Sequence, residues 1–224
     1  MCRTFAHRRQ DIITQQMSIK DIKERWPALF DVSQVSAEFR TITTVTLEPT
    51  FMAMLDFYTP KLLSIFQAKK GAVGERHRAQ MSVLLQSGTP NQQTRGIVIR
   101  YLIDHLGENP CDLIKDFEDA AGAPVSVEEE LSGEVMKIYL LPNPGTSTAD
   151  STDVGIVIEG IPVLTNLGDL SRACCHLLGL TYVFDLKYPP KLKHSFEVFQ
   201  KVLLELESLN LSPKVQRLKT CPLA

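Results

Sequence analysis

The sequence has few of the features that mark secreted or membrane proteins. Its five cysteines are an odd number, two are adjacent and none forms a C-x-x-C pair, which disfavours a secreted disulfide framework. No apolar run approaches the roughly 20 residues that a bilayer-spanning helix needs. The N-terminus "MCRTFAHRRQ" lacks the apolar stretch of a secretory signal. These absences favour reduced thiols in the cytoplasm or nucleus, with a mitochondrial presequence as the alternative.

The sequence also has no large excess of positive or negative charge. The formal net charge is −2, and 22% of the residues are charged, so bulk electrostatics attracts the chain to neither nucleic acid nor membrane. The chain has 224 residues, 44% of them apolar, which is enough for one large domain or two small ones with a real core.

The common catalytic and nucleotide-binding motifs are absent. The sequence contains no G-x-x-x-x-G-K-[ST], G-x-G-x-x-G, H-E-x-x-H or G-x-S-x-G pattern. The histidines do not have the spacing of a four-ligand zinc site; they include His7, His77, His105 and His194. The sequence therefore predicts no enzyme, no cofactor and no bound metal.

Hydrophobic periodicity predicts a mostly helical α+β protein. We expect a helical N-terminal half and a smaller C-terminal half with a β-hairpin, further strands and two helices. The expected organisation is a basic flexible arm (1–17), a helical domain (18–121), an acidic connector (122–134), an α+β domain (135–212) and a tail (213–224).

In the N-terminal half, Ser18 is placed to cap a helix that ends near Pro27, with Asp21 as its partner three residues on. Further helices are expected over 32–44, 47–70, 76–85 and 93–106. In the helix over 47–70 a wide apolar stripe marks a central core helix, and Pro60 predicts a kink or break near residues 57–59. A short helix is expected before residue 121.

In the C-terminal half, "VMKIYLLP" and "VGIVIEGIPVLT" have the composition of strands, and Glu159-Gly160 predicts a tight hairpin. A helix is expected from about residue 166 to Gly179. The run "LTYVFDL" then predicts a strand, which Pro189 and Pro190 end. Because proline is well tolerated in a first helical turn, a last helix should follow, with Phe196 and Phe199 in its buried face.

Two longer stretches resemble a known group of proteins. They are "EFRTITTVTLEPTFMAMLDFYTPKLLSIFQAKKG" and "LLGLTYVFDLKYPPKLKHSFEVFQKVLLELESLNLSPKVQRLK". Together they resemble a multicopy group of fish proteins labelled sterile alpha motif domain-containing protein 3-like. The resemblance covers residues 18–219 and implies the C-terminal region of that group, without the sterile alpha motif itself. It implies no catalytic residues.

Cys174, Cys175 and His176 are the first candidate for chemistry. A nucleophilic cysteine needs a base within hydrogen-bond reach, whereas adjacent helical residues diverge by about 100°. Cys174 falls on the apolar stripe of its helix, so buried structural cysteines are the favoured interpretation. An enzyme that used Cys175 and His105 is a weaker alternative.

Two further candidates are binding or modification sites. Lys69, Lys70, Arg76 and Arg78 form a basic patch that would suit phosphates and nucleic acid; a solvated helix end is the plainer alternative. The last four residues, "CPLA", fit the C-a-a-X pattern of prenylation at Cys221, although a four-residue match occurs easily by chance.

The leading hypothesis is a non-enzymatic intracellular protein-interaction module. Exposed strand edges and amphipathic helices are common recognition surfaces. The candidate surfaces are the exposed side of the helix over 51–66 and the hairpin edge over 156–163. The alternative is a nucleic-acid-binding protein of transposon-related origin that uses the basic patch.

If the basic patch binds nucleic acid, its affinity should fall steeply with salt. Replacing Arg76 and Arg78 by Gln should then reduce the slope of log K against log salt by about 2, since each lost phosphate contact contributes roughly 0.9. Fluorescence anisotropy with labelled DNA and RNA measures this, and Lys191→Gln with Lys193→Gln is the control outside the patch. Absent or salt-independent binding would exclude the alternative.

Overall fold

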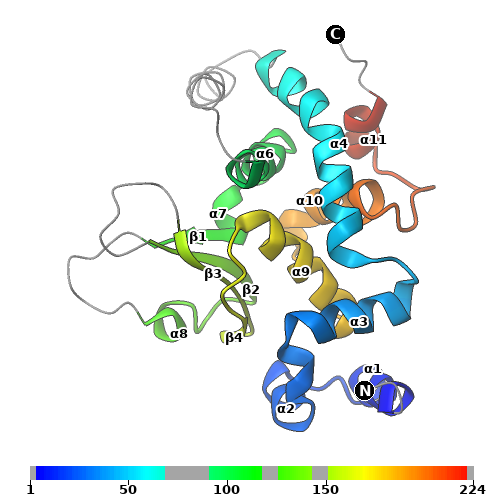
Figure 1. Ribbon diagram of the computed structural model, residues 1–224, viewed down its shortest axis with the longest axis vertical. Helices are drawn as coiled ribbons and strands as arrows, with labels where there is room; N and C mark the ends of the chain where they lie inside the picture. Colours follow the sequence, from blue (N-terminus) through cyan, green and yellow to red (C-terminus); the bar gives the residue numbers. More distant parts are fainter. Residues whose placement is uncertain (1–3, 69–90, 118–125, 143–150, 221–224) are drawn as a thin grey trace. The chain divides into compact units, whose positions relative to one another are not determined.

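The computed structural model describes residues 4–68, 91–117, 126–142 and 151–220 (Figure 1). The chain divides into two compact units, and each is assembled from separate stretches of sequence. Unit 1 comprises Met1–Glu48 and Cys111–Pro189, and unit 2 comprises Pro49–Pro110 and Pro190–Ala224. The expected fold class, mostly helical α+β, is confirmed, with the strands of the described residues all in unit 1.

Unit 1 is built on a mixed sheet in the order β1-β2-β3-β4. Its strands are β1 (Ile114–Asp116), β2 (Met136–Pro142), β3 (Ser151–Ile158) and β4 (Ile161–Leu164). β1 runs parallel to β2, and the other neighbours are antiparallel. The two longer predicted strand segments are therefore confirmed. β1 was missed, because only the helix α7 (Pro110–Leu113) occupies the place of the longer helix expected there.

The predicted hairpin is confirmed at Glu159-Gly160. Ile158 pairs with Ile161, and the two turn residues have φ of 51° and 72°. Positive φ at both central residues is the geometry of the two-residue turn that matches strand twist. Gly160 has a second constraint, because a Cβ there would lie 2.3 Å from the Ser132 carbonyl oxygen.

The sheet carries apolar side chains on both faces. Phe117, Leu131, Tyr139 and Val157 form one small cluster, and period-two alternation places Ile138 and Ile156 on the opposite face. The helix α9 (Leu170–Val183) packs against β2 and β3. Gly155 is required beside Tyr139, because a Cβ there would lie 2.3 Å from its ring.

The first residues of unit 1 are helical. A flexible arm was expected over residues 1–17, but Phe5–Gln15 form helix α1. This helix has buried contacts: Ile12 is 4% exposed, the side chain of Arg8 is 1% exposed, and Arg8 Nη2 donates to Glu38 Oε2 at 2.5 Å.

The other predicted N-terminal helices agree closely with the structure. In α2 (Ile19–Arg25) the Ser18 hydroxyl accepts from the Asp21 N–H at 3.2 Å, as predicted. A 3₁₀ turn, η2 (Pro27–Phe30), leads to α3 (Val32–Thr43), whose Val35 and Phe39 are fully buried. The short helix α8 (Val127–Glu130) lies between β1 and β2 in sequence.

The strand predicted for "LTYVFDL" is wrong, because α9 continues through this segment to Val183. The composition of the segment favours a strand, but burial of Leu180 and Val183 in the helical conformation overrides that preference. Gly179 is likewise a packing residue and not a helix end: a Cβ there would lie 2.5 Å from Leu47 Cδ2 and 3.2 Å from Val35 Cγ1. The glycine lets α3 and the start of α4 approach α9.

Unit 2 is helical over its described residues. The helix α4 (Leu47–Ala68) begins with two residues of unit 1 and continues into unit 2, where α6 (Asn91–His105) follows. A kink or a break was expected near Pro60; the break is absent, since α4 continues past the proline, and the buried residues Phe51, Leu55, Leu62 and Phe66 lie on both sides of it. The helix expected over 76–85 lies outside the described residues.

The last elements of unit 2 begin where the prolines predicted a helix start. The 3₁₀ turn η3 (Pro190–Leu192) leads to α10 (Lys193–Val198) and a π-helical turn, η4 (Phe199–Leu203). Phe196 and Phe199 are fully buried, as predicted, and the ring of Phe199 lies 5.7 Å from that of Phe51. The helix α11 (Pro213–Thr220) buries Val215 and Leu218.

The packing at Gly179 gives a stability prediction. Alanine normally favours a helix over glycine by about 1 kcal/mol, but the added methyl would overlap Leu47. We expect Gly179→Ala to lower the free energy of unfolding by about 1–3 kcal/mol, measured by urea denaturation. The loss should shrink in a Leu47→Ala background, where the methyl has room.

Gly133→Ala is the matched control, because a Cβ there meets nothing within 4 Å; its effect should stay within about 0.5 kcal/mol. A Gly179→Ala protein more stable than the parent would contradict the packing argument.

Candidate functional site

The basic patch and the prenylation candidate cannot be placed. Lys69, Lys70, Arg76, Arg78 and Cys221 all lie outside the described residues. The nucleic-acid and prenylation hypotheses therefore stay predictions from the sequence.

The hairpin edge, one of the two candidate partner surfaces, has few free backbone groups with which an added strand could pair. β4 has four residues, and Pro162 within it has no N–H to offer an added strand. Its carbonyl accepts from Lys23 Nζ of α2 at 2.9 Å. Beside it, the Glu159 carboxylate accepts from the backbone N–H of Ile19 at 2.9 Å. The Pro162 carbonyl is therefore already bonded where a partner strand would pair.

The outer face of α4, the second candidate surface, carries an exposed aromatic side chain. Phe57 is 72% exposed, whereas Phe51, Leu55 and Phe66 on the buried stripe have no exposure. The ring of Phe57 meets that of Tyr58 edge to face, with the centroids 5.1 Å apart. Among the described residues, the other large apolar side chains that are exposed are Ile13, Val135 and Leu209, and Phe57 is the aromatic member of this set.

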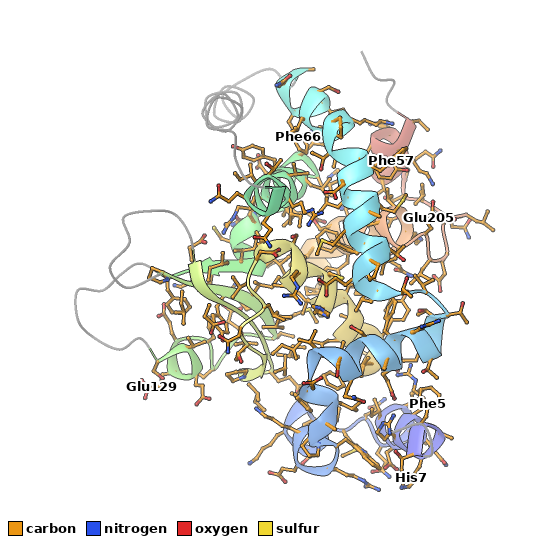
Figure 2. The ribbon with its side chains drawn as sticks, in the orientation of Figure 1. Phe5, His7, Phe57, Phe66, Glu129 and Glu205 are labelled. Atoms are coloured by element: carbon orange, nitrogen blue, oxygen red, sulfur yellow. The ribbon has the colours of Figure 1, made fainter. Side chains whose placement is uncertain are left out.

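The surroundings of Phe57 are polar and partly acidic. Asp56 receives two hydrogen bonds from Arg95 of α6, at 2.7 and 2.5 Å, so its charge is balanced. Burial, and then the charge of Glu205, raise the pKa of Tyr58, which places that carboxylate close to the aromatic pair. Figure 2 labels Phe57 and Glu205 on the same side of α4. The face thus combines an apolar centre with a charged neighbour.

A second site, which we call the α9 cluster, consists of Glu48, Arg172 and His176 in unit 1. Arg172 Nε donates to Glu48 Oε1 at 2.9 Å, and Arg172 Nη2 to Oε2 at 3.5 Å. His176 Nε2 lies 3.2 Å from the same Oε2. Arg172 and His176 are one helical turn apart on α9, and Glu48 stands in the first turn of α4, where a negative charge is also favoured by the helix dipole.

Within the α9 cluster His176 is shielded from water, whereas the side chains of Arg172 and Glu48 are 36% and 33% exposed. His176, Cys174 and Cys175 have no exposed surface. Burial lowers the pKa of His176, more than the neighbouring Glu48 raises it. Burial, reinforced by Glu48, raises the pKa of Cys175 well above its usual value. The imidazole is therefore neutral near pH 7, and Cys175 is a thiol.

This chemistry does not favour Cys175 as a nucleophile. The thiolate is the reactive form, and reactive cysteines lie in electropositive, partly exposed surroundings. Cys175 has a raised pKa and no exposure. His105, its proposed partner, lies on α6 with its ring centroid 5.6 Å from that of Phe66.

A third polar site, around Glu108 in unit 2, is structural. One carboxylate oxygen of Glu108 accepts from the His194 N–H at 2.8 Å, and the other from the Ser195 N–H at 3.0 Å. The carboxylate thereby satisfies donors at the start of α10 that would otherwise be unpaired. The separation of 86 residues between Glu108 and His194 gives no signal in the sequence.

The sequence analysis also missed Glu48 and Arg172. His176 and Arg172 share a helix face by their spacing, but their carboxylate partner is 124 residues from Arg172. Over the described residues, no group of three or more His, Cys, Asp or Glu side chains is arranged to hold a metal ion. Within the same residues, no helix combines the length and the apolar character needed to cross a membrane.

Residues 1–31 match the family model described as sterile alpha motif domain-containing protein 3, helical domain. The match covers α1, α2 and η2 of unit 1, and it supports a relationship to sterile alpha motif domain-containing protein 3-like proteins. No curated protein and no solved structure matches the chain.

The burial of the cysteines gives a direct chemical prediction. In the native protein, iodoacetamide at pH 7.5 should label Cys111, which is exposed, and leave Cys174 and Cys175 unmodified until denaturant is added. Peptide mapping by mass spectrometry measures the three sites in one sample, so Cys111 serves as the internal control. Labelling of Cys175 as fast as that of Cys111 would restore it as a candidate nucleophile.

Proposed function

We propose that this protein is a non-enzymatic intracellular interaction module that binds a protein partner through the Phe57 face of α4. We define this face by Ala53, Met54, Phe57 and Tyr58, which follow one another along the helix surface at helical spacing. The single observation that carries the proposal is the 72% exposure of Phe57.

The geometry favours this face over the hairpin edge. An amphipathic helix that presents an apolar anchor is a common recognition device, and buried aromatic residues dominate the binding energy of many interfaces. A partner that covered Phe57 and Tyr58 would bury a preformed aromatic pair with few rotamers to restrict. The hairpin edge offers no N–H at Pro162, and its carbonyl there is already bonded.

The match of residues 1–31 to the helical domain of sterile alpha motif domain-containing protein 3 supports this class of function, because it points to a helical module. We further propose that the chain corresponds to the C-terminal region of the multicopy fish group that it resembles, on the two sequence stretches quoted above. A cytoplasmic or nuclear location is part of the same proposal, and it rests on the cysteine pattern.

Replacing Phe57 by Ser tests the proposal. An interface anchor contributes 2 kcal/mol or more in typical alanine scans, which corresponds to a loss of affinity of at least about 30-fold. The measurement is quantitative recovery of co-purifying proteins by mass spectrometry from a cell extract, followed by titration of the recovered partner against parent and variant.

Val135→Ser is the matched control, because Val135 is also 72% exposed but lies in unit 1. Circular dichroism and the urea midpoint establish that both variants fold. Equal recovery by Phe57→Ser and Val135→Ser would reject the Phe57 face. The absence of any partner for the parent protein, together with a monomeric sedimentation profile, would reject the interaction module itself.

A further inference from the structure

We propose that a cavity in unit 1, between α1 and the end of α9, binds a small aromatic carboxylate. The cavity has a volume of about 320 Å³, which is at the lower end of the range for small-molecule sites. The residues that would form the site all belong to unit 1: Arg9, Tyr182, Asp185, Leu186, Lys187 and Tyr188. The site is separate from the Phe57 face, which lies in unit 2.

The guanidinium of Arg9 is fixed at the cavity by hydrogen bonds on one side. Its Nη1 donates to the carbonyl oxygens of Tyr182 and Val183, at 2.8 and 3.1 Å. These carbonyls stand at the end of α9, where helix carbonyls have no partner within the helix. The two bonds therefore satisfy the helix end and hold in place a cationic side chain that is 22% exposed.

The Nε side of the same guanidinium is not hydrogen-bonded. No described residue accepts from Arg9 Nε or Nη2, since Asp185 Oδ1 lies 3.6 Å from Nη2, too far for a hydrogen bond. The N–H groups of these two nitrogens point the same way and can bind both oxygens of one carboxylate. In unit 2, Arg95 uses its Nε and Nη2 in this manner for the carboxylate of Asp56. Arg9 thus presents an unused carboxylate-binding pair of donors.

The charges around the cavity favour an anion with a single charge. Arg9 and Lys187 contribute two positive charges, and Asp185 contributes one negative charge. Lys187 is exposed, and no described residue pairs with its ammonium group. A carboxylate would compensate the excess of one positive charge. A phosphate, with a charge of about −1.5 to −2, would leave an excess of negative charge beside Asp185 and the negative end of the α9 dipole.

The uncharged part of the lining favours an aromatic ligand. Tyr182, Leu186 and Tyr188 supply the apolar surface of the cavity. The ring of Tyr182 is positioned by an edge-to-face contact with Phe39, with the centroids 5.2 Å apart. Aromatic rings pair favourably in offset or edge-to-face arrangements. A planar ring that carries one carboxylate therefore complements both the tyrosine rings and the free donors of Arg9.

Amide-resolved NMR of the full chain tests the site, with benzoate as the probe. Benzoate should shift the backbone amide signals of residues 181–188 and the Nε–H signal of Arg9 in a saturable manner. The expected Kd is about 1 mM or below, which is ordinary for a ligand of this size. Benzyl alcohol, which lacks the charge, and phenyl phosphate, which has too much, should each bind at least about tenfold more weakly.

Two substitutions distinguish this site from nonspecific binding. Lys187→Gln removes a positive charge and should weaken benzoate binding by about threefold, whereas Asp185→Asn removes the competing carboxylate and should strengthen it by about the same factor. Asparagine tolerates the φ of 56° at position 185, so this variant should fold. Lys20→Gln is the matched control, because Lys20 is an exposed lysine of unit 1 outside the cavity; it should leave the Kd unchanged.

The absence of saturable shifts at residues 181–188 of the parent protein, with benzoate at up to about 10 mM, would overturn the proposal. Equal affinity for benzoate and benzyl alcohol would also overturn it, because the donors of Arg9 would then take no part in binding. Tighter binding of phenyl phosphate than of benzoate would reject the carboxylate as the ligand class.

Discussion

The close approach of α3 and the first turn of α4 to α9 is the constraint on which unit 1 depends. α9 packs against α3, β2 and β3, so it joins the helical and β parts of the unit. The approach requires Gly179, since any side chain there would enter the space of Leu47 and Val35. One residue without a side chain thereby permits α3 and the first turn of α4 to pack closely on α9.

The same helix explains where the sequence analysis failed. Local signals with a local cause were recovered: the Ser18 cap, the two-residue hairpin turn and the proline start of the last helices. The extension of α9 through residues 180–183 was missed, because β-branched and aromatic residues favour strands only when their neighbours form a sheet. The helix α1 was also missed, because the buried partner of Arg8 is Glu38, which is 30 residues away in the sequence.

The polar sites show a similar limit. A cap can be predicted from two residues three apart, but Glu48 and Glu108 find their partners across 124 and 86 residues. No spacing rule covers such distances. The boundaries between the units also have no distinctive composition. One of them lies inside the continuous helix α4, where no linker-like sequence marks it. Sequence patterns identified elements well and their assembly poorly, since assembly depends on which faces meet.

The partnered charged side chains and the exposed side chain of Phe57 differ in whether folding explains their positions. Arg8 and Glu108 are buried and Glu48 is half-buried, and each has a partner that joins one structural element to another, so folding explains their positions. Phe57 has no comparable explanation: its neighbours on the same helix fill the core, and its own ring meets mostly solvent and Tyr58. Exposing a large apolar side chain forgoes about 1.5–3 kcal/mol of burial. Under the proposed function, a partner surface that covered Phe57 would recover this free energy, which burial within the unit does not supply.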